Sequence, residues 1–259
     1  MTTVIALRNK PRLNKPVLVV GLPGVGSVGR MVARHLIKEC KAERFATLYS
    51  DHLPHKTVMK KDGTLRLVNN RFYYIKNKKK GGNDIVLLTG DDQPMTPEGQ
   101  YEVNKRIVNF FINELNGSFI YTIGGYNNPA SQTTQKPKVF GNASDRKVVG
   151  LFKSEDVVFG ESKGFILGSA GMIVAFAKKA KLPAICLMGE ARAIDIDTRA
   201  AKTVTEMLSA KLGIKTDTSS FDKTEENINK MLNNLASEMQ QDINTPQPHS
   251  QEDPFSYIR

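Results

Sequence analysis

A glycine-rich turn near the start of the chain has residues that could bind an anion. The buried-looking run Val17-Leu18-Val19-Val20 ends at this turn, and an amphipathic segment follows, so we expect a strand, a tight loop and a helix over residues 27–38. Amide groups at such a helix start can hold a phosphate. The candidate anion or nucleotide loop comprises Gly21, Gly24, Gly26, Ser27 and Gly29, with Asp51 after the next predicted strand as the candidate ribose-binding acid.

The spacing of these glycines departs from both known phosphate-binding patterns. Gly24 to Gly29 match G-x-G-x-x-G, but Leu22-Pro23 lengthens the turn between the strand and this fingerprint. Ser27-Val28 stands where the phosphate loop of NTPases needs Lys followed by Ser or Thr. The alternative is a turn whose glycines allow positive φ and close packing of helix on sheet. The packing interpretation is favoured over phosphate binding, so no cofactor is predicted from this loop, and a nucleotide-binding enzyme or sensor stays the alternative.

Acidic and histidine side chains also follow predicted strands. Asp91 and Glu190 would lie in the crevice where parallel strands end, and could bind Mg²⁺, act as acid and base, or cap helices. Sequence alone does not choose among these roles. His52 and His55 are three residues apart, but no third ligand stands near them, so ordinary loop histidines are favoured and no metal site is expected.

Composition narrows the partners and the compartment. The net charge is +11, and its densest cluster is Lys76-Asn77-Lys78-Lys79-Lys80-Gly81-Gly82. Because no stacking aromatic residues or RNA-binding signature accompany this cluster, a solvated loop tip is favoured over a nucleic-acid contact. No apolar run is long enough to span a membrane, the N-terminus does not read as a signal peptide, and two cysteines form no disulfide framework. We therefore expect a cytoplasmic protein.

Repetition of strand, glycine turn and helix predicts the fold class. We expect an α/β protein with a three-layer, mostly parallel, doubly wound sheet and helices on both faces. Residues 64–68 and 72–75 are predicted to pair as a hairpin, and residues 148–152 to form a strand. Further helices are predicted from residue 97 to Gly117, over 172–181 and over 198–212.

The chain is predicted to form one folded domain with a tail. The domain spans residues 1–241, including a basic hairpin at 64–86 and a C-terminal helix at about 221–241. Residues 242–259 are too polar and proline-rich to hold a fold, so we expect a flexible tail. Its tip carries apolar and aromatic side chains that could dock in a partner's pocket: Phe255, Tyr257, Ile258 and Arg259.

Several short motifs occur in the order seen in the archaeal proteasome assembly chaperone family. They are Gly21-Leu22-Pro23-Gly24-Val25-Gly26, Leu88-Thr89-Gly90-Asp91-Asp92-Gln93-Pro94, Glu98-Gly99-Gln100-Tyr101, Thr122-Ile123-Gly124-Gly125-Tyr126, Gly168-Ser169-Ala170-Gly171 and Leu187-Met188-Gly189-Glu190. The chain resembles that family over roughly residues 15–215 and the tail. Members have also been catalogued as ATP-grasp enzymes, but no residues here support that label.

The resemblance implies a non-enzymatic homo-oligomer with an outline like that of nucleoside phosphorylases. It also implies a chaperone or binding factor acting on the α-subunits or the 20S core of the proteasome. Family members can use a C-terminal motif of a hydrophobic residue, tyrosine and any residue, whereas here Tyr257 is third from the end. If the tail docks, Tyr257 would seal the pocket mouth, Ile258 would add apolar burial and the Arg259 carboxylate would meet a lysine.

Overall fold

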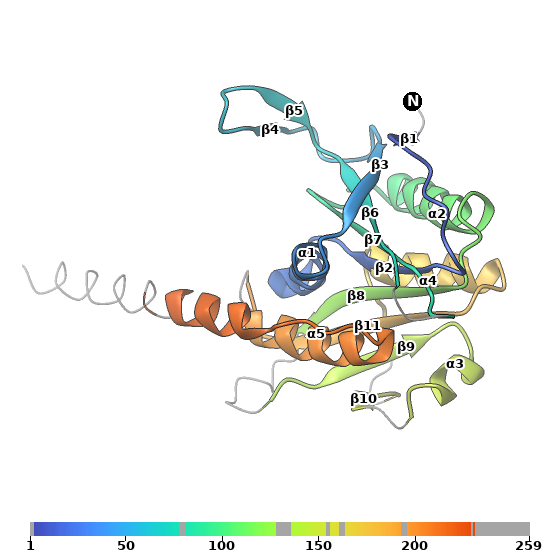
Figure 1. The fold of residues 1–259 in the computed structure, drawn as a ribbon, viewed down its shortest axis with the longest axis vertical. Coiled ribbons are helices and arrows are strands. Elements are labelled where there is room, and N and C mark those ends of the chain that lie inside the picture. The colour runs from blue at the N-terminus through green and yellow to red at the C-terminus, as the bar shows by residue number, and fades with distance from the viewer. Residues whose placement is uncertain are drawn as a thin grey trace, which may run out of the picture.

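A nine-stranded sheet forms the centre of the molecule (Figure 1). The computed structural model describes residues 3–77, 81–127, 136–153, 156–160, 164–192, 196–228 and 230. In these residues the strand order is β1-β3-β6-β7-β2-β8-β11-β9-β10. The strands are β1 (Val4–Leu7), β2 (Val17–Gly21), β3 (Glu43–Tyr49), β6 (Asn70–Ile75), β7 (Ile85–Gly90), β8 (Phe119–Asn127), β9 (Val139–Ala143), β10 (Val157–Val158) and β11 (Ala184–Ala191).

The four central strands, β7, β2, β8 and β11, run parallel. Strands β2, β7 and β11 are buried along their whole length, which suits their runs of aliphatic and β-branched residues. Their carboxyl ends lie at one edge of the sheet. The glycine loop follows β2 there, Asp91 follows β7, and Glu190 lies near the end of β11. The buried central strands predicted from the sequence are confirmed.

The prediction of a mostly parallel sheet was wrong, because the sheet is mixed. Among the eight pairings of the nine strands described, four are antiparallel: β1 with β3, β3 with β6, β6 with β7, and β11 with β9. Parallel neighbours need a long crossover, usually a helix, whereas β3, β6 and β7 follow one another without a helix between them. The chain therefore returns antiparallel on that side of the sheet.

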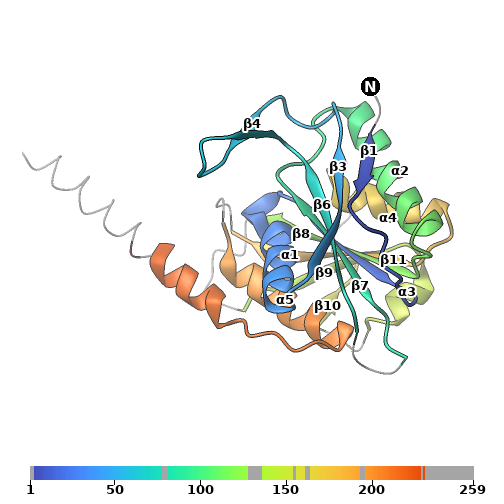
Figure 2. The ribbon, with the colours of Figure 1, turned by 45° about the horizontal axis from the view of Figure 1, so that its top comes forward.

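Helices cover both faces of the sheet and produce the three layers that the sequence predicts (Figure 2). Helices α1 (Val28–Glu39) and α5 (Thr198–Leu212) pack together on one face, and α2 (Pro97–Asn113) and α4 (Ser169–Lys179) on the other. Each face of the sheet has its own hydrophobic core, and alternate residues of β2 point to opposite faces. Val19 packs in the core on the α1 side and Leu18 in the core on the α2 side. The bounds of α5 are those predicted.

Helix caps explain one success and one error of the sequence analysis. The hydroxyl of Thr96 accepts a hydrogen bond from the amide of Gly99 and starts α2 where it was predicted. Residues 148–152, predicted as a strand, instead belong mainly to the short helix α3 (Arg146–Gly150) and the turn after it. The Asp145 carboxylate accepts hydrogen bonds from two amides of α3, and this cap outweighs the strand preference of Val148 and Val149.

The hairpin predicted between residues 64–68 and 72–75 was also wrong. Strand β5 (Leu65–Leu67) pairs with β4 (Thr57–Met59) in a separate two-stranded sheet, here called the arm, which projects from the main body in Figures 1 and 2. Strand β6 instead pairs with β3 and β7. The strands on either side of the basic cluster, β6 and β7, pair at Ile75 and Ile85, while residues 78–80 of the cluster lie outside the described residues.

The C-terminal part of the chain is described only in its first turns. Residues 219–228 are helical, which agrees with the start of the helix predicted at about 221–241. Residues 231–241 and the tail at 242–259 lie outside the described residues. The domain boundary at residue 241 stays a prediction.

Candidate functional site

The glycine loop joins β2 to α1 through a short 3-10 turn, η1 (Val25–Ser27). Gly26 has φ of 58° and Ser27 has φ of 51°, both left-handed. Gly26 suits this conformation because it lacks a Cβ, whereas Ser27 bears the cost that a side chain imposes there. Ser27 precedes the first residue of α1, yet its side chain does not cap the helix.

The other glycines of this region allow the backbone to pack very closely. A Cβ on Gly21 would lie 2.0 Å from the carbonyl oxygen of Gly29, and one on Gly29 would lie 2.3 Å from that of Ile123 in β8. A Cβ on Gly125, also in β8, would lie 2.2 Å from the carbonyl oxygen of Val25. Helix α1 and its loop therefore pack directly on the ends of β2 and β8, as the packing interpretation of these glycines requires.

Gln93 bridges the two sides of the crevice beside this loop. Its amide nitrogen donates to the carbonyl oxygen of Pro23, and its amide oxygen accepts from the backbone N–H of Ser169, 2.8 Å away. Ser169 is the first residue of α4, so the Gln93 side chain occupies the helix N-terminus where an anion would otherwise bind. The remaining cavity, lined by residues including Leu22, Ile123 and Gln93, has a volume of about 130 Å³. Small-molecule sites usually have about 300 Å³ or more.

The fold does not bring the predicted acids together. Asp51 follows β3, and two strands, β6 and β7, separate β3 from β2. Because neighbouring strands are about 4.8 Å apart, three spacings place the end of β3 about 14 Å from the end of β2. Asp91 follows β7 and Glu190 lies in β11, with β2 and β8 between them. The Glu190 carboxylate accepts from the backbone N–H of Lys138 at 3.1 Å, beside β9.

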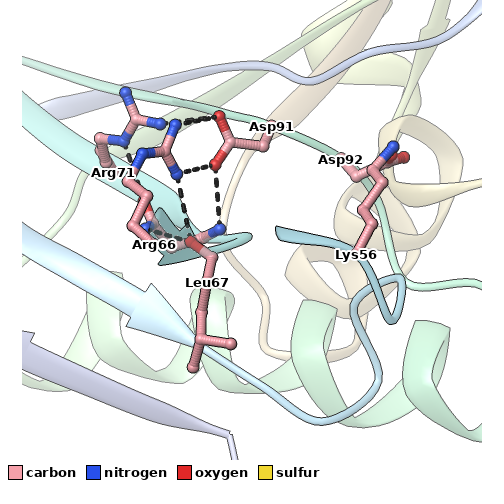
Figure 3. A network of polar contacts seen from close by, with 7 residues as sticks. Lys56, Arg66, Leu67, Arg71, Asp91 and Asp92 are labelled. Carbon is pink, nitrogen blue, oxygen red and sulfur yellow. Dashed lines mark hydrogen bonds and ion pairs between the residues drawn. The ribbon is translucent and has the colours of Figure 1, made fainter. Parts of the chain in front are cut away.

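Asp91 is the centre of an arginine cluster (Figure 3). Arg66 of the arm binds both carboxylate oxygens, one of them at 2.9 Å, and Arg71 of β6 binds at 2.7 Å. The amide of Asn69 donates to the same carboxylate at 3.1 Å. Burial would raise the pKa of Asp91, but the hydrogen bonds from Arg66 and Asn69 and the charge of Arg71 overcome it and hold the pKa at about 2. Asp91 thus fixes the arm to the sheet.

The neighbouring acid makes a weaker contact to the same region. Asp92 binds the Lys56 ammonium group at 2.5 Å, and more than half of the Lys56 side chain is exposed. Lys56 directly precedes β4, so this pair holds the base of the arm at a second point (Figure 3). Solvent weakens such exposed ion pairs.

The two histidines near the end of β3 are not arranged as metal ligands. His52 Nε2 lies 2.9 Å from the carboxylate of Glu102 in α2, and that carboxylate also accepts from the hydroxyl and the amide of Thr3. The Thr3 hydroxyl and then His52 lower the pKa of Glu102 to about 2. This cluster ties the start of the chain to α2. In the part of the chain that the structure describes, no three His, Cys, Asp or Glu side chains gather as a metal site would.

The basic loop and the tail are described only in part or not at all. Lys76 binds Asp84 across the loop at 3.0 Å, while Lys78, Lys79 and Lys80 lie outside the described residues. Phe255, Tyr257, Ile258 and Arg259 lie outside them too. Within the described ranges, no helix has the length and apolar character needed to cross a membrane.

Sequence reasoning missed the residues that organise this edge of the sheet. Gln93 stands in a polar run after β7, and nothing in its spacing indicates a bridge to α4. Arg71 gave a stronger signal, because a charged residue in a strand otherwise made of Phe72, Tyr73, Tyr74 and Ile75 needs a partner. The pairing of Arg66 with Asp91 depends on the arm, which the sequence analysis placed incorrectly.

Comparison with known proteins agrees with this architecture. The model of the PAC2 family matches residues 18–236. An uncharacterised protein of Methanocaldococcus jannaschii is 31% identical over 243 residues, which cover 93% of this chain and 92% of that protein. The matches give no support to the ATP-grasp label.

Two crystal structures from Pyrococcus furiosus are similar over nearly the whole chain. PbaB, an archaeal proteasome activator, has a TM-score of 0.85 and 30% identity, covering 91% of this chain and 99% of PbaB. PbaA in its monoclinic form, an archaeal homologue of proteasome-assembly chaperone, has a TM-score of 0.77 and 24% identity, covering 93% of this chain and 94% of PbaA. At that identity the likeness to PbaA concerns the fold.

Proposed function

Because this chain belongs to the PAC2 family, we propose that it is a non-enzymatic proteasome-binding factor, either an activator or an assembly chaperone. The observation that carries this proposal is the similarity to PbaB, which extends over almost all of both chains at 30% identity. The α-subunits of the 20S core are the proposed target. The cytoplasm as its compartment and the outline like that of nucleoside phosphorylases stay predictions.

We propose that the C-terminal tail is the contact with the α-ring. Tyr257 would seal the mouth of a pocket between subunits, Ile258 would bury apolar surface, and the Arg259 carboxylate would bind a lysine. Burial of a tyrosine and an isoleucine contributes only about 3 to 6 kcal/mol before the ordering of the tail is counted. Useful affinity therefore needs several tails on one homo-oligomer, whose linkage raises the effective concentration of each.

The geometry of the glycine loop does not favour the alternative of a nucleotide-binding enzyme. The close contacts of Gly21, Gly29 and Gly125 give these glycines a packing role. The Gln93 side chain holds the start of α4, and the cavity beside it is about 130 Å³. These observations support a packed strand-end region, so we make no second proposal.

The proposal is tested by mixing the purified protein with archaeal proteasome α-subunits and with the assembled 20S core. Size exclusion with light scattering compares the full chain with a chain that ends at Glu252, and a chain with residues 253–259 in scrambled order serves as the length-matched control. We expect only the full chain, and neither the truncated nor the scrambled chain, to co-elute with a proteasome species. If the truncated and the scrambled chains also co-elute, the contact lies on the folded domain. If the full chain co-elutes with neither the α-subunits nor the 20S core, the proposed function is refuted.

A peptide-hydrolysis assay separates the two forms of the proposal. An activator increases hydrolysis by the assembled core, whereas an assembly chaperone speeds the appearance of the core from free subunits and leaves the hydrolysis rate of the finished core unchanged.

A further inference from the structure

Among the described residues, one part of the sheet has little helix cover on one face. Helix α1 lies against β2, β7 and β8, and α5 lies beyond it over β11, so in the described part of the chain neither helix packs closely on the same face of β1 and β3. A groove of about 690 Å³ lies there, between these strands and the arm. Figure 2 shows β1 and β3 at this edge with the arm standing away from them.

The groove carries strong positive charge. Its basic residues lie in β3, β5 and β6 or directly after β1 and β4: Arg8, Arg44, Lys60, Arg66 and Arg71. Asp91 provides one carboxylate for two of these arginines, and Lys60 lies 4.0 Å from Asp62. Among the residues described, Arg8 and Arg44 form no ion pair with a carboxylate. The groove therefore keeps a surplus of unneutralised guanidinium groups.

Apolar side chains stand next to these charges. Leu7, Tyr49 and Leu67 line the groove and are exposed. In the arm, Met59 pairs with Leu65 across the two strands, and both share the face of Leu67. Met59 is 84% exposed and Leu65 62%. The opposite face of the arm carries Arg66, which points to Asp91, so the apolar face is the outer one and joins the groove at Leu67.

We propose that this groove and the outer face of the arm bind an extended acidic segment of a partner protein, with apolar residues between its carboxylates. Guanidinium groups pair with carboxylates in a fixed bidentate geometry, and the leucines and Met59 suit aliphatic or aromatic side chains in between. Strand β1 ends the sheet and so offers an edge to which an extended segment can add as a strand.

Two other occupants fit these features less well. A second copy of this chain has a net charge of +11, so it matches the positive charge of this groove less well than an acidic segment does. A nucleic acid would match the charge but would make little use of the aliphatic residues Leu7, Met59 and Leu67. The inference goes beyond the proposed function, because the groove lies on the folded domain and does not involve the tail.

The test measures binding of a fluorescein-labelled peptide of alternating glutamate and leucine by fluorescence anisotropy, with the full chain. The groove variant combines Arg8→Gln and Arg44→Gln, which break no ion pair within the described part of the chain. The matched control combines Lys178→Gln and Lys179→Gln on the exposed surface of α4, on the opposite face of the sheet. Thermal unfolding followed by circular dichroism checks that both variants fold.

We expect the groove variant to bind the peptide at least about tenfold more weakly and the control to bind within about twofold of the unchanged protein. A peptide that alternates glutamate with serine should also bind more weakly, because it lacks the apolar side chains. No binding of the first peptide, or equal weakening in both variants, would overturn the proposal.

The unchanged protein and the two variants also test whether a nucleic acid or a second copy of the chain occupies the groove. If labelled oligothymidylate binds more tightly than the peptide and depends on Arg8 and Arg44, the groove is a nucleic-acid site and the proposal is wrong. If the groove variant changes the molecular mass in light scattering while peptide binding is absent, the groove is an interface between copies and the proposal is wrong as well.

Discussion

Replacement of Asp91 by asparagine should destabilise the protein in a way that depends on pH. The change removes the negative charge that Arg66 and Arg71 share, while it keeps the size of the side chain. The pKa of Asp91 falls from its ordinary value of 3.8 to about 2 in the folded protein. The Asp91 side chain is only 12% exposed, so solvent screens its ion pairs little.

The magnitude follows from this shift. A group whose pKa is lowered by folding stabilises the folded state above its unfolded pKa, and this contribution is lost as the pH falls through the folded pKa. The lowered pKa of Asp91 corresponds to about 2 kcal/mol near pH 7, about 1 kcal/mol near pH 3 and under about 0.5 kcal/mol near pH 2. Asp91→Asn should therefore lower the free energy of unfolding by these decreasing amounts.

Urea unfolding followed by circular dichroism measures these differences, which suits a chain without tryptophan. Asp92→Asn is the neighbouring control, because Asp92 pairs with the largely exposed Lys56 and its loss should cost less than about 1 kcal/mol at any of these pH values. If Asp91→Asn costs the same free energy near pH 7 and near pH 2, the charge of Asp91 is not the source of the stabilisation and the reasoning fails.

Two further substitutions test the packing and capping described above. Gly21→Ala should lower the free energy of unfolding by about 1 to 3 kcal/mol, since its Cβ would clash with the Gly29 carbonyl, whereas Gly150→Ala, with open space around it, should change it by less than about 0.5 kcal/mol. Asp197→Ala should cost about 2 to 4 kcal/mol, because the fully buried Asp197 caps α5 and pairs with two guanidinium groups; the exposed Asp222→Ala should cost under about 1 kcal/mol. Urea unfolding near neutral pH checks both pairs, and equal losses in a variant and its control would contradict the structural explanation.

Local patterns predicted the elements that depend on local contacts. Helix α5 has the predicted bounds, because its apolar stripe, its Asp197 cap and the final Gly213 all agree. Residues 148–152 misled the prediction, because the capping carboxylate of Asp145 outweighs two valines. The arm was missed because β5 pairs with β4, which precedes it in the chain. The sequence of a strand as short as β5 does not indicate which neighbouring strand it pairs with.

In the candidate site too, features set by local sequence were predictable and features set by long-range contacts were not. The packing interpretation of the glycines was reachable from the sequence, because the strand, the glycine turn and the helix follow one another along the chain, although the contacts of Gly29 and Gly125 join α1 and its loop to β8. The distance of Asp51 from the loop was not, because it depends on the insertion of β6 and β7 between β3 and β2. Asp91 was correctly placed at a strand end, but its role depends on Arg66, which a different part of the fold brings to it.

The two ends of the nine-stranded sheet differ in how they resist aggregation. Strand β10 has only two residues, so an incoming chain finds few backbone groups there to pair with. Strand β1 is longer, but the segment after it, Arg8-Asn9-Lys10-Pro11-Arg12, combines three positive charges with a proline. Copies of this basic chain repel one another at that edge, whereas an acidic strand is attracted to it. The positive charge at this edge thus opposes aggregation between copies of the chain and favours binding of an acidic partner segment.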